Sequence, residues 1–387
     1  MNDELAPQMD CYEEVLKEIE LSRRFGSDYS LERGEVARYI NALHPPRMTL
    51  RVREIIQETS STATFRLIPA DGQLPPFLAG QYVTLFLTIG KIRTARPYSI
   101  SSPPNQTAWY DVTIRRVEEG LVSNHLLDTI QIGDLIETSG PVGTFYYNPI
   151  IHRPVVAFIA GGSGITPFMS MIREIYDRGL DRRVFLFYGN RDSTDIIFGE
   201  EIERIAAVSA NIHYVPVIEN PDEQYDGRRG FITGSVVKEE MKTLHDATFF
   251  ICGPQGMYDF CLPELEAMGI PRRSVRREMS GPPLQVWEQP GWPEEVKKDA
   301  VFSLSVGGVK TATIRAPATE SILTTLEKNG IPVPSLCRSG ECSLCRLKLL
   351  SGTVFQPRGT PIRKSDRQFG YIHSCAAYPL EDCAVLI

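Results

Sequence analysis

Four of the eight cysteines have a spacing that suits iron chemistry better than a disulfide framework. They form the pattern C-x4-C-x2-C, with a fourth cysteine thirty residues later: Cys337, Cys342, Cys345 and Cys375. Plant-type [2Fe-2S] centres use this spacing, and Ser339 and Gly340 allow a tight loop whose amides can bond to cluster sulfur. The alternative is a structural zinc site, which usually pairs two short C-x2-C knuckles, whereas one is present here. We therefore predict a [2Fe-2S] cluster on these four thiolates.

Two glycine-containing segments can hold phosphate groups. Gly120-Leu121-Val122-Ser123 opens a predicted helix whose free N–H groups and positive dipole end suit a pyrophosphate, and the alternative is helix capping by Ser123 alone. Gly161-Gly162-Ser163-Gly164-Ile165-Thr166-Pro167 follows a buried strand and leads into a helix with proline in its first turn. Its glycines let the backbone approach a diphosphate, and the alternative is a plain glycine-rich turn. We expect Gly120, Val122 and Ser123 to bind one dinucleotide and Gly161, Gly162, Gly164 and Thr166 another.

A third segment, Arg96-Pro97-Tyr98-Ser99, resembles the R-x-Y-S/T run of the ferredoxin-NADP reductase family. The resemblance implies that Arg96 pairs with a flavin phosphate, that Tyr98 packs on the isoalloxazine and that Ser99 bonds near its N5. Gly140-Pro141-Val142-Gly143-Thr144-Phe145 also resembles a segment that closes the family's flavin barrel. Because the helix after Gly120 suits a pyrophosphate, FAD is favoured over FMN.

The segment Cys252-Gly253-Pro254 resembles the part of that family that lines the nicotinamide pocket. The resemblance places Cys252 near the hydride-transferring carbon and implies that Tyr98, Ser99 and Cys252 are the catalytic residues. Family members often end this domain with glutamate and an aromatic residue, but here the run is Glu278-Met279-Ser280. NADPH users tend to show Ser-Arg where this chain has Glu219-Asn220, which favours NADH and leaves NADPH possible.

These motifs fall in segments of different pattern. Amphipathic spacing near the N-terminus predicts two short helices, Tyr12 to Ile19 and Val36 to Leu43. The next segment has the pattern of β-strands. After it, predicted strands alternate with predicted helices, which is typical of βαβ units. With the resemblance, we predict a helical extension, an antiparallel flavin-binding β-barrel, a Rossmann-like parallel α/β domain, a proline-rich linker and a β-grasp ferredoxin domain. Their ranges are 1–46, 47–149, 150–280, 281–300 and 301–387.

The order flavin, nicotinamide, ferredoxin resembles the reductase components of phthalate and phenylacetyl-CoA oxygenases and hybrid-cluster-protein reductase. A hydride carries two electrons and a [2Fe-2S] centre accepts one, so a flavin is needed between them. The resemblance implies an NAD(P)H-dependent oxidoreductase that passes electrons through FAD and its cluster to an acceptor protein, such as an oxygenase or another metalloenzyme. The alternative is a redox-sensing or assembly protein with the same cofactors, whose N-terminal helices bind a partner.

Charge and composition narrow the partners and the location. The net charge of −7 does not indicate a protein that binds nucleic acid, which would need an excess of basic residues. No apolar run approaches the roughly 20 residues of a membrane span, and no signal sequence opens the chain, so we expect a cytoplasmic protein. Residues 301–387 hold ten Lys/Arg against six Asp/Glu. We therefore expect the acceptor to present an acidic face and to dock near the cluster on Arg338 and Arg346.

Overall fold

The computed structural model describes residues 11–25, 38–279, 281, 283, 285–308 and 311–387. The chain divides into two compact units, Met1–Pro46 and Arg47–Ile387. In the first unit, α1 spans Tyr12–Phe25 and residues 38–43 are helical. The two predicted helices are therefore present where the structure describes them, and Val36 lies outside the described residues.

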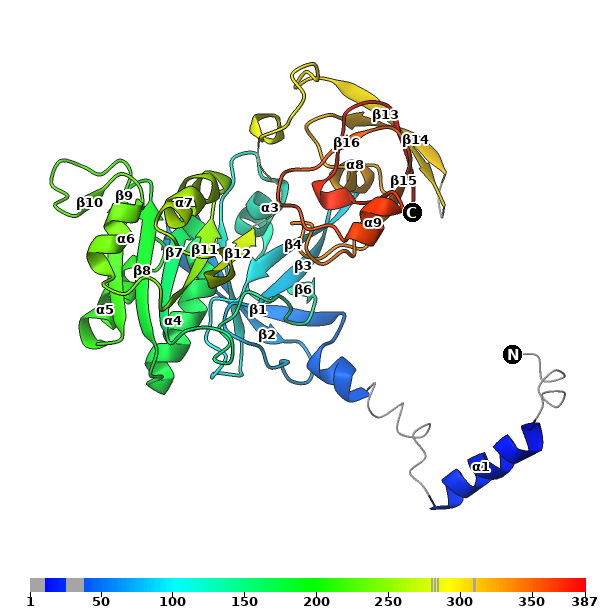
Figure 1. The fold of residues 1–387 in the computed structure, drawn as a ribbon, viewed down its shortest axis with the longest axis horizontal. Helices are drawn as coiled ribbons and strands as arrows, with labels where there is room; N and C mark the ends of the chain where they lie inside the picture. The colour runs from blue at the N-terminus through cyan, green and yellow to red at the C-terminus, as the bar shows by residue number, and fades with distance from the viewer. Residues whose placement is uncertain (1–10, 26–37, 280, 282, 284, 309–310) are drawn as a thin grey trace. The chain divides into compact units, whose positions relative to one another are not determined.

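The flavin-binding region is one antiparallel sheet with the strand order β4-β3-β6-β1-β2-β5 (Figure 1). Its elements are β1 (Met48–Thr59), β2 (Thr62–Pro69), β3 (Tyr82–Ile89), β4 (Ile92–Ser99), β5 (Tyr110–Arg115), α3 (Leu121–Thr129) and β6 (Leu135–Thr138). The two edge strands are joined by the isolated bridge Ile100–Val112. The sheet is thus curled rather than fully closed, which is consistent with the predicted barrel.

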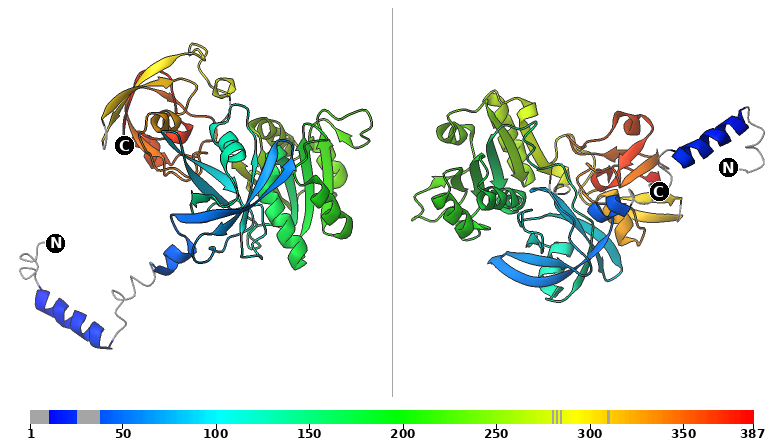
Figure 2. Two further views of the ribbon diagram at one scale, coloured as in Figure 1. Left: turned by 180° about the vertical axis from the view of Figure 1, so that it is seen from behind. Right: turned by 90° about the horizontal axis from the view of Figure 1, so that it is seen from below.

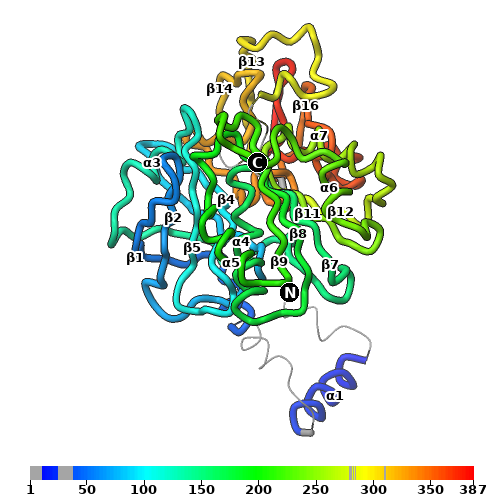
Figure 3. Tube along the Cα trace, turned by 90° about the vertical axis from the view of Figure 1, so that its left-hand side faces the viewer, coloured from blue at the N-terminus to red at the C-terminus, as the bar shows by residue number. Residues whose placement is uncertain are grey.

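The next region is a parallel sheet with the order β10-β9-β8-β7-β11-β12, whose strands run side by side in Figure 3. Its strands are β7 (Val155–Gly161), β8 (Arg183–Asn190), β9 (Ile212–Ile218), β10 (Arg228–Arg229), β11 (Ala247–Gly253) and β12 (Val275–Met279). Its α-helices are α4 (Thr166–Arg178), α5 (Gly199–Val208), α6 (Gly234–Glu240) and α7 (Gln255–Ala267), with 3-10 helices at Gly162–Ile165 and Arg272–Ser274.

Alternate side chains of β7 serve two separate cores, as a strand covered on both faces requires. Val156 and Phe158 pack with α4 and α5, whereas Ala157 and Ile159 pack with α6 and α7. The strand order reverses next to β7, because β8 and β9 extend to one side and β11 to the other. In such sheets the crevice at the carboxyl ends of the strands, where the order reverses, is the usual ligand site.

The C-terminal region is a five-stranded mixed sheet with the order β14-β13-β19-β15-β17, drawn in yellow to red in Figure 2. Its strands are β13 (Val301–Gly307), β14 (Ala312–Pro317), β15 (Arg346–Ser351), β17 (Tyr371–His373) and β19 (Cys383–Leu386), and β16 (Val354–Phe355) pairs separately with β18 (Tyr378–Pro379). Its helices are α8 (Ile322–Lys328), α9 (Lys364–Gln368) and a 3-10 turn at Ser374–Ala376. α8 packs on the sheet through Ile322, Leu323 and Leu326. This is the predicted β-grasp arrangement.

The linker between the last two regions packs on the ferredoxin region. Val286, in a 3-10 turn at Val286–Glu288, is buried with Phe355 and Tyr378. The ring of Trp292 meets that of Phe355 edge-on, with centroids 5.2 Å apart. In the part of the chain that the structure describes, no helix has the length and apolarity needed to cross a membrane.

Candidate redox site

The residues predicted from the flavin motif line a single cavity of about 460 Å³. β4 ends there with Arg96, Pro97, Tyr98 and Ser99, and the start of α3 contributes Gly120, Val122 and Ser123. The other regions also reach this cavity, through Thr166 of α4 and through Cys337, Ser339 and Glu341 of the cysteine loop. Segments far apart in the sequence therefore share one site.

The start of α3 is open to an anion. Gly120 precedes the helix, and no side chain caps the first-turn N–H groups. The Ser123 hydroxyl instead accepts a hydrogen bond from the backbone N–H of Val117 at 3.2 Å, so capping by Ser123 is not what the structure shows. A Cβ on Gly120 would lie 2.5 Å from that hydroxyl oxygen, which is why glycine stands here. The free N–H groups and the helix dipole suit a diphosphate.

Arg96 is a partly buried cation without a carboxylate of its own. Its Nη1 donates to the Thr94 hydroxyl at 2.7 Å and to the Ala95 carbonyl at 2.8 Å, and among the described residues it forms no ion pair. Burial, and then the guanidinium of Arg338, lower the pKa of Arg96 to about 10. A guanidinium in this state favours an anionic partner. The residues therefore fit a flavin diphosphate.

Glu278, at the end of β12, contacts the hydroxyl of Ser99, and both residues line the cavity. Its Oε2 is buried without a hydrogen-bond partner. Burial, and then the nearby carboxylate of Glu341, raise the pKa of Glu278 to about 8. Next to the serine of the flavin motif, this carboxyl therefore keeps its proton to a higher pH than an open-chain glutamate does.

The predicted nucleotide loop and the Cys-Gly-Pro segment meet at the carboxyl ends of β7 and β11. A Cβ on Gly164 would lie 2.1 Å from the Cys252 carbonyl oxygen, so the two backbones touch. Gly161 is similarly close to Pro254, whose Cδ would lie 2.9 Å from an added Cβ. Gly253 also faces Gly161. This contact at the reversal of strand order is the expected place for a dinucleotide.

The nucleotide loop and the Cys-Gly-Pro segment lie mostly outside the larger cavity. Gly162 has a φ of +50°, and the Thr166 hydroxyl donates to the Ser163 carbonyl at 3.0 Å. Gly161, Gly162, Gly164, Cys252, Gly253 and Pro254 do not line the cavity of about 460 Å³, although Thr166 does. The Cys252 side chain is 1% exposed and contacts the Tyr258 hydroxyl. Its predicted role at the nicotinamide stays a prediction.

The four predicted cluster cysteines come together as two pairs of contacting thiols, Cys337 with Cys342 and Cys345 with Cys375. Two pairs suit two irons with two thiolates each. The N–H of Cys342 donates to the Cys337 sulfur at 3.3 Å, and the Gly340 N–H faces Cys375. Among the described residues no group of three or more His, Cys, Asp or Glu side chains is arranged around a single metal ion. The donor set fits the predicted [2Fe-2S] cluster.

The cysteine loop is held against the flavin sheet, and this corrects one expectation. Arg338 was expected to face a partner protein, but its side chain is 3% exposed and pairs with Glu327 of α8. It also donates from Nη2 to the Thr94 hydroxyl of β4 at 3.0 Å. Arg346, in contrast, is partly exposed and pairs with Asp366 at 2.9 Å. The loop sequence alone does not distinguish these two arginines, because the burial depends on β4.

Several residues of the site carry no motif. Arg115 of β5 lines the cavity, pairs with Asp195 and lies against Gly162, where an added Cβ would be 2.7 Å from its Nη1. Thr94 and Glu327 link the flavin strand to the ferredoxin helix. Each of these contacts joins segments that are distant in the sequence, so no local sequence pattern predicts the contacts.

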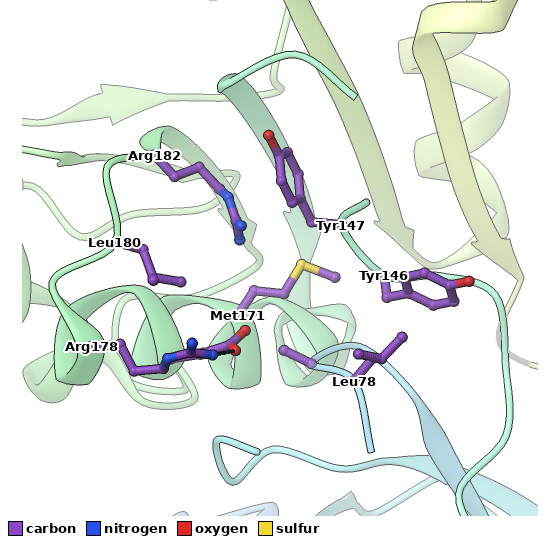
Figure 4. A pocket seen from close by; sticks show the side chains of 9 residues that line it. Leu78, Tyr146, Tyr147, Met171, Arg178, Leu180 and Arg182 are labelled. Carbon is purple, nitrogen blue, oxygen red and sulfur yellow. Dashed lines mark hydrogen bonds and ion pairs between the residues drawn. The ribbon is translucent and has the colours of Figure 1, made fainter. Parts of the chain in front are cut away.

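A second cavity, of about 190 Å³, lies between the flavin region and α4. Figure 4 shows Met171 at its centre, with Arg182 next to Tyr147, and the Arg182 Cζ is 3.5 Å from the centroid of that ring. No residue predicted from the sequence motifs lines it. The chemistry therefore belongs to the larger cavity.

Three family models match successive parts of the chain. They are an oxidoreductase FAD-binding domain at residues 47–147, an oxidoreductase NAD-binding domain at 158–262 and a 2Fe-2S iron-sulfur cluster binding domain at 308–380. These matches confirm the predicted cofactors, FAD, NAD(P) and a [2Fe-2S] cluster. Each range lies inside a predicted domain, whose borders stay predictions.

Several relatives align with most of the chain. The glycine betaine monooxygenase reductase subunit of Pseudomonas aeruginosa is 30% identical over 354 residues, covering 88% of this chain and 95% of that protein. The NADH oxidoreductase HCR of Escherichia coli is 28% identical over 337 residues, covering 86% and 95%. Among solved structures, phthalate dioxygenase reductase has a TM-score of 0.64 at 23% identity and covers 88% of this chain and 97% of its own, which shows a shared fold.

The relatives, the three matched domains and the shared cavity all indicate redox chemistry with the same cofactors. The chain is an NAD(P)H-dependent oxidoreductase that carries electrons through FAD to its [2Fe-2S] cluster and on to an acceptor protein. It belongs to the family of three-domain iron-sulfur flavoprotein reductases that includes the reductase components of oxygenases.

Proposed function

We propose that this reductase takes hydride from NADH and delivers single electrons to an oxygenase component or another metalloenzyme. The observation that carries the proposal is the single cavity of about 460 Å³, which flavin strand, nucleotide helix and cysteine loop all line. A flavin, when bound, accepts two electrons together and releases them singly. Since the cysteine loop lines the same cavity, a flavin bound there would lie beside the residues that would hold the cluster.

The residues of the chain position these groups. We propose that Arg96 and the first N–H groups of α3 hold the flavin diphosphate, while Tyr98 and Ser99, beside Pro97, orient its ring system. The Gly161–Gly164 loop and the N–H groups at the start of α4 would hold the dinucleotide diphosphate. The cluster would be ligated by four thiolates, those of Cys337, Cys342, Cys345 and Cys375. The backbone N–H groups of the loop would donate hydrogen bonds to the cluster sulfurs.

We propose NADH over NADPH because Glu219 and Asn220 directly follow β9. There the 2′-phosphate of NADPH would meet the carboxylate of Glu219. Comparing kcat/KM for the two dinucleotides tests this. We also propose a cytoplasmic location, since thiolate ligands and reduced dinucleotide both belong to a reducing compartment.

The function is tested by following the cofactors of the purified protein during anaerobic addition of NADH. We expect bleaching of the flavin absorption and then the paramagnetic signal of a reduced [2Fe-2S] cluster. In Cys342→Ser, the cluster signal should disappear while flavin reduction remains, and Cys11→Ser, at an exposed cysteine, should behave as wild type. A colourless protein, or a cluster that NADH never reduces, contradicts the proposal.

The acceptor would dock on an exposed basic patch beside the cluster. We define the basic patch as Arg346, Arg363, Lys364, Arg367 and Phe369. The first is the residue after the ligand Cys345, and its ion pair with the buried Asp366 ties it to α9. Phe369 is 63% exposed at the end of that helix. Residues 344–371 contain six Lys/Arg and a single acidic residue, the buried Asp366.

A patch of this kind fits an acidic partner face and a central apolar contact. We expect Lys364→Glu with Arg367→Glu to slow reduction of the native acceptor at least tenfold and to abolish its dependence on ionic strength. Reduction of ferricyanide, which needs no docking, should keep its rate. The matched control is Lys238→Glu with Lys242→Glu, two exposed lysines of the nucleotide region. An acceptor rate that stays at the wild-type value rules the patch out.

A further inference from the structure

One hydroxyl joins the flavin strand to the cluster loop. The Thr94 oxygen accepts from Arg96 Nη1 at 2.7 Å and from Arg338 Nη2 at 3.0 Å. It also donates to Glu327 Oε2 at 3.1 Å. A hydroxyl has one donor and two acceptor positions, so all three are used. The flavin arginine of β4 and the arginine of the cysteine loop are therefore fixed on the same atom.

The network carries more positive than negative charge. It holds two guanidiniums and the single carboxylate of Glu327, which pairs with Arg338. The side chains of Arg338 and Glu327 are 3% and 6% exposed, and Thr94 is also buried. A buried charge without a counter-charge is costly, so the network favours an additional anion.

Arg338 also has an unused donor next to the cavity. Its Nε is buried without a hydrogen-bond partner, and Arg338 is one of the residues that line the cavity of about 460 Å³. Its backbone φ of +53° is a left-handed conformation that arginine rarely adopts. The contacts with Thr94 and Glu327 hold the side chain against the barrel from this strained position.

We propose that Arg338 of the ferredoxin region acts with Arg96 as a second ligand of the flavin diphosphate, so that flavin binding and seating of the ferredoxin region on β4 are coupled. This inference rests on the proposed function, because it assigns the anion to the flavin. The coupling is reciprocal: whatever the flavin contributes to seating the cluster loop, the seated loop returns as flavin affinity. Arg338 is then a positioning residue for the cluster as well as a flavin ligand.

The first test measures flavin affinity without turnover. FAD is titrated into flavin-free protein that retains its cluster, and quenching of flavin fluorescence gives the Kd. The test variant combines Arg338→Met with Glu327→Gln, which removes the arginine without leaving a buried carboxylate alone. We expect the Kd to rise on the order of tenfold, the loss of one charge-assisted hydrogen bond, with the cluster absorption unchanged. The control combines Arg315→Met with Glu381→Gln, both exposed in the same region.

The second test reads the coupling itself, by amide hydrogen exchange of peptides covering residues 321–342. In the wild type, added FAD should slow their exchange. In the Arg338→Met and Glu327→Gln variant at saturating FAD, the exchange of these peptides should no longer respond to FAD, whereas the Arg315→Met and Glu381→Gln variant should respond as wild type.

Two results overturn the proposal. One is a Kd for the Arg338→Met and Glu327→Gln variant within twofold of the wild type. The other is FAD-dependent protection that persists in that variant at saturating FAD. A wild-type protein that binds no FAD at all is a different result, since it overturns the proposed function and is read before any variant is made.

Discussion

Glu278, which lines the larger cavity, shows how burial sets the chemistry of a single residue. Glu278 stands against Ser99, and burial together with Glu341 raises the pKa of its carboxyl to about 8, from 4.5 in an open chain. Between these values the unfolded chain has lost a proton that the folded protein keeps. Stability therefore falls as the pH rises through this window, because the folded state binds more protons there.

Replacing this carboxyl by an amide should remove that pH dependence. Glu278→Gln resembles the neutral acid, so we expect little change in the melting temperature of the flavin-free protein near pH 5. At pH 8 the variant should melt higher than the wild type, since it avoids an ionised buried carboxylate. Thermal unfolding from pH 5 to 8 checks this, with the exposed Glu294→Gln as the control. Parallel pH profiles for wild type and Glu278→Gln would refute the neutral state.

The placement of residues that share a local sequence pattern could be predicted from the sequence, whereas their roles stay predictions. The cysteine spacing, Arg96 to Ser99 and the glycines at 161, 162 and 164 are local patterns, and the structure gathers each of them as a site. The burial of Arg338 was not predictable, because it depends on Thr94 and Glu327, which are 244 and 11 residues away. Contacts between domains leave no spacing in the sequence.

At the level of elements, two loops at the ends of β7 and β11 are packed so closely that glycine is required. Gly164 touches the Cys252 carbonyl, where an added Cβ would be only 2.1 Å from the oxygen. The Cβ is fixed to the Gly164 backbone and the oxygen belongs to the Cys252 backbone, so neither can give way without moving a strand end. The parallel sheet was predictable from the alternation of strands and helices, but this contact follows from its strand order.

The Gly164→Ala variant tests this contact. We expect it to lower the free energy of unfolding by about 1–3 kcal/mol, as overpacking does, and to raise the KM for NADH because the loop must shift. The control is Gly256→Ala in α7, where an added Cβ meets nothing within 4 Å. There the substitution should stabilise by about 0.4–1 kcal/mol through the unfolded chain. Denaturant unfolding and NADH kinetics check both, and equal stability of the two variants would contradict the crowding.

At the scale of the whole molecule, the chain separates redox machinery from its N-terminal extension. Every residue that lines the larger cavity lies within Arg47–Ile387, and the matched domains begin at residue 47. The extension differs in charge as well, with ten Asp/Glu against five Lys/Arg in residues 1–46. Its helices expose Leu16, Ile19 and Ile40, a composition suited to contact with another surface.

Deleting residues 1–46 therefore tests whether the extension binds a partner protein or is needed by the redox machinery. Because cofactor sites lie outside it, we expect the shortened chain to retain FAD and cluster and to reduce ferricyanide with NADH within twofold of the full-length rate. If the extension binds a partner, reduction of the native acceptor falls in the same preparation while the ferricyanide rate holds. Flavin content, iron content and the two rates, measured side by side, separate these cases. Loss of flavin on deletion would show that the redox machinery needs the extension, against the division at residue 46.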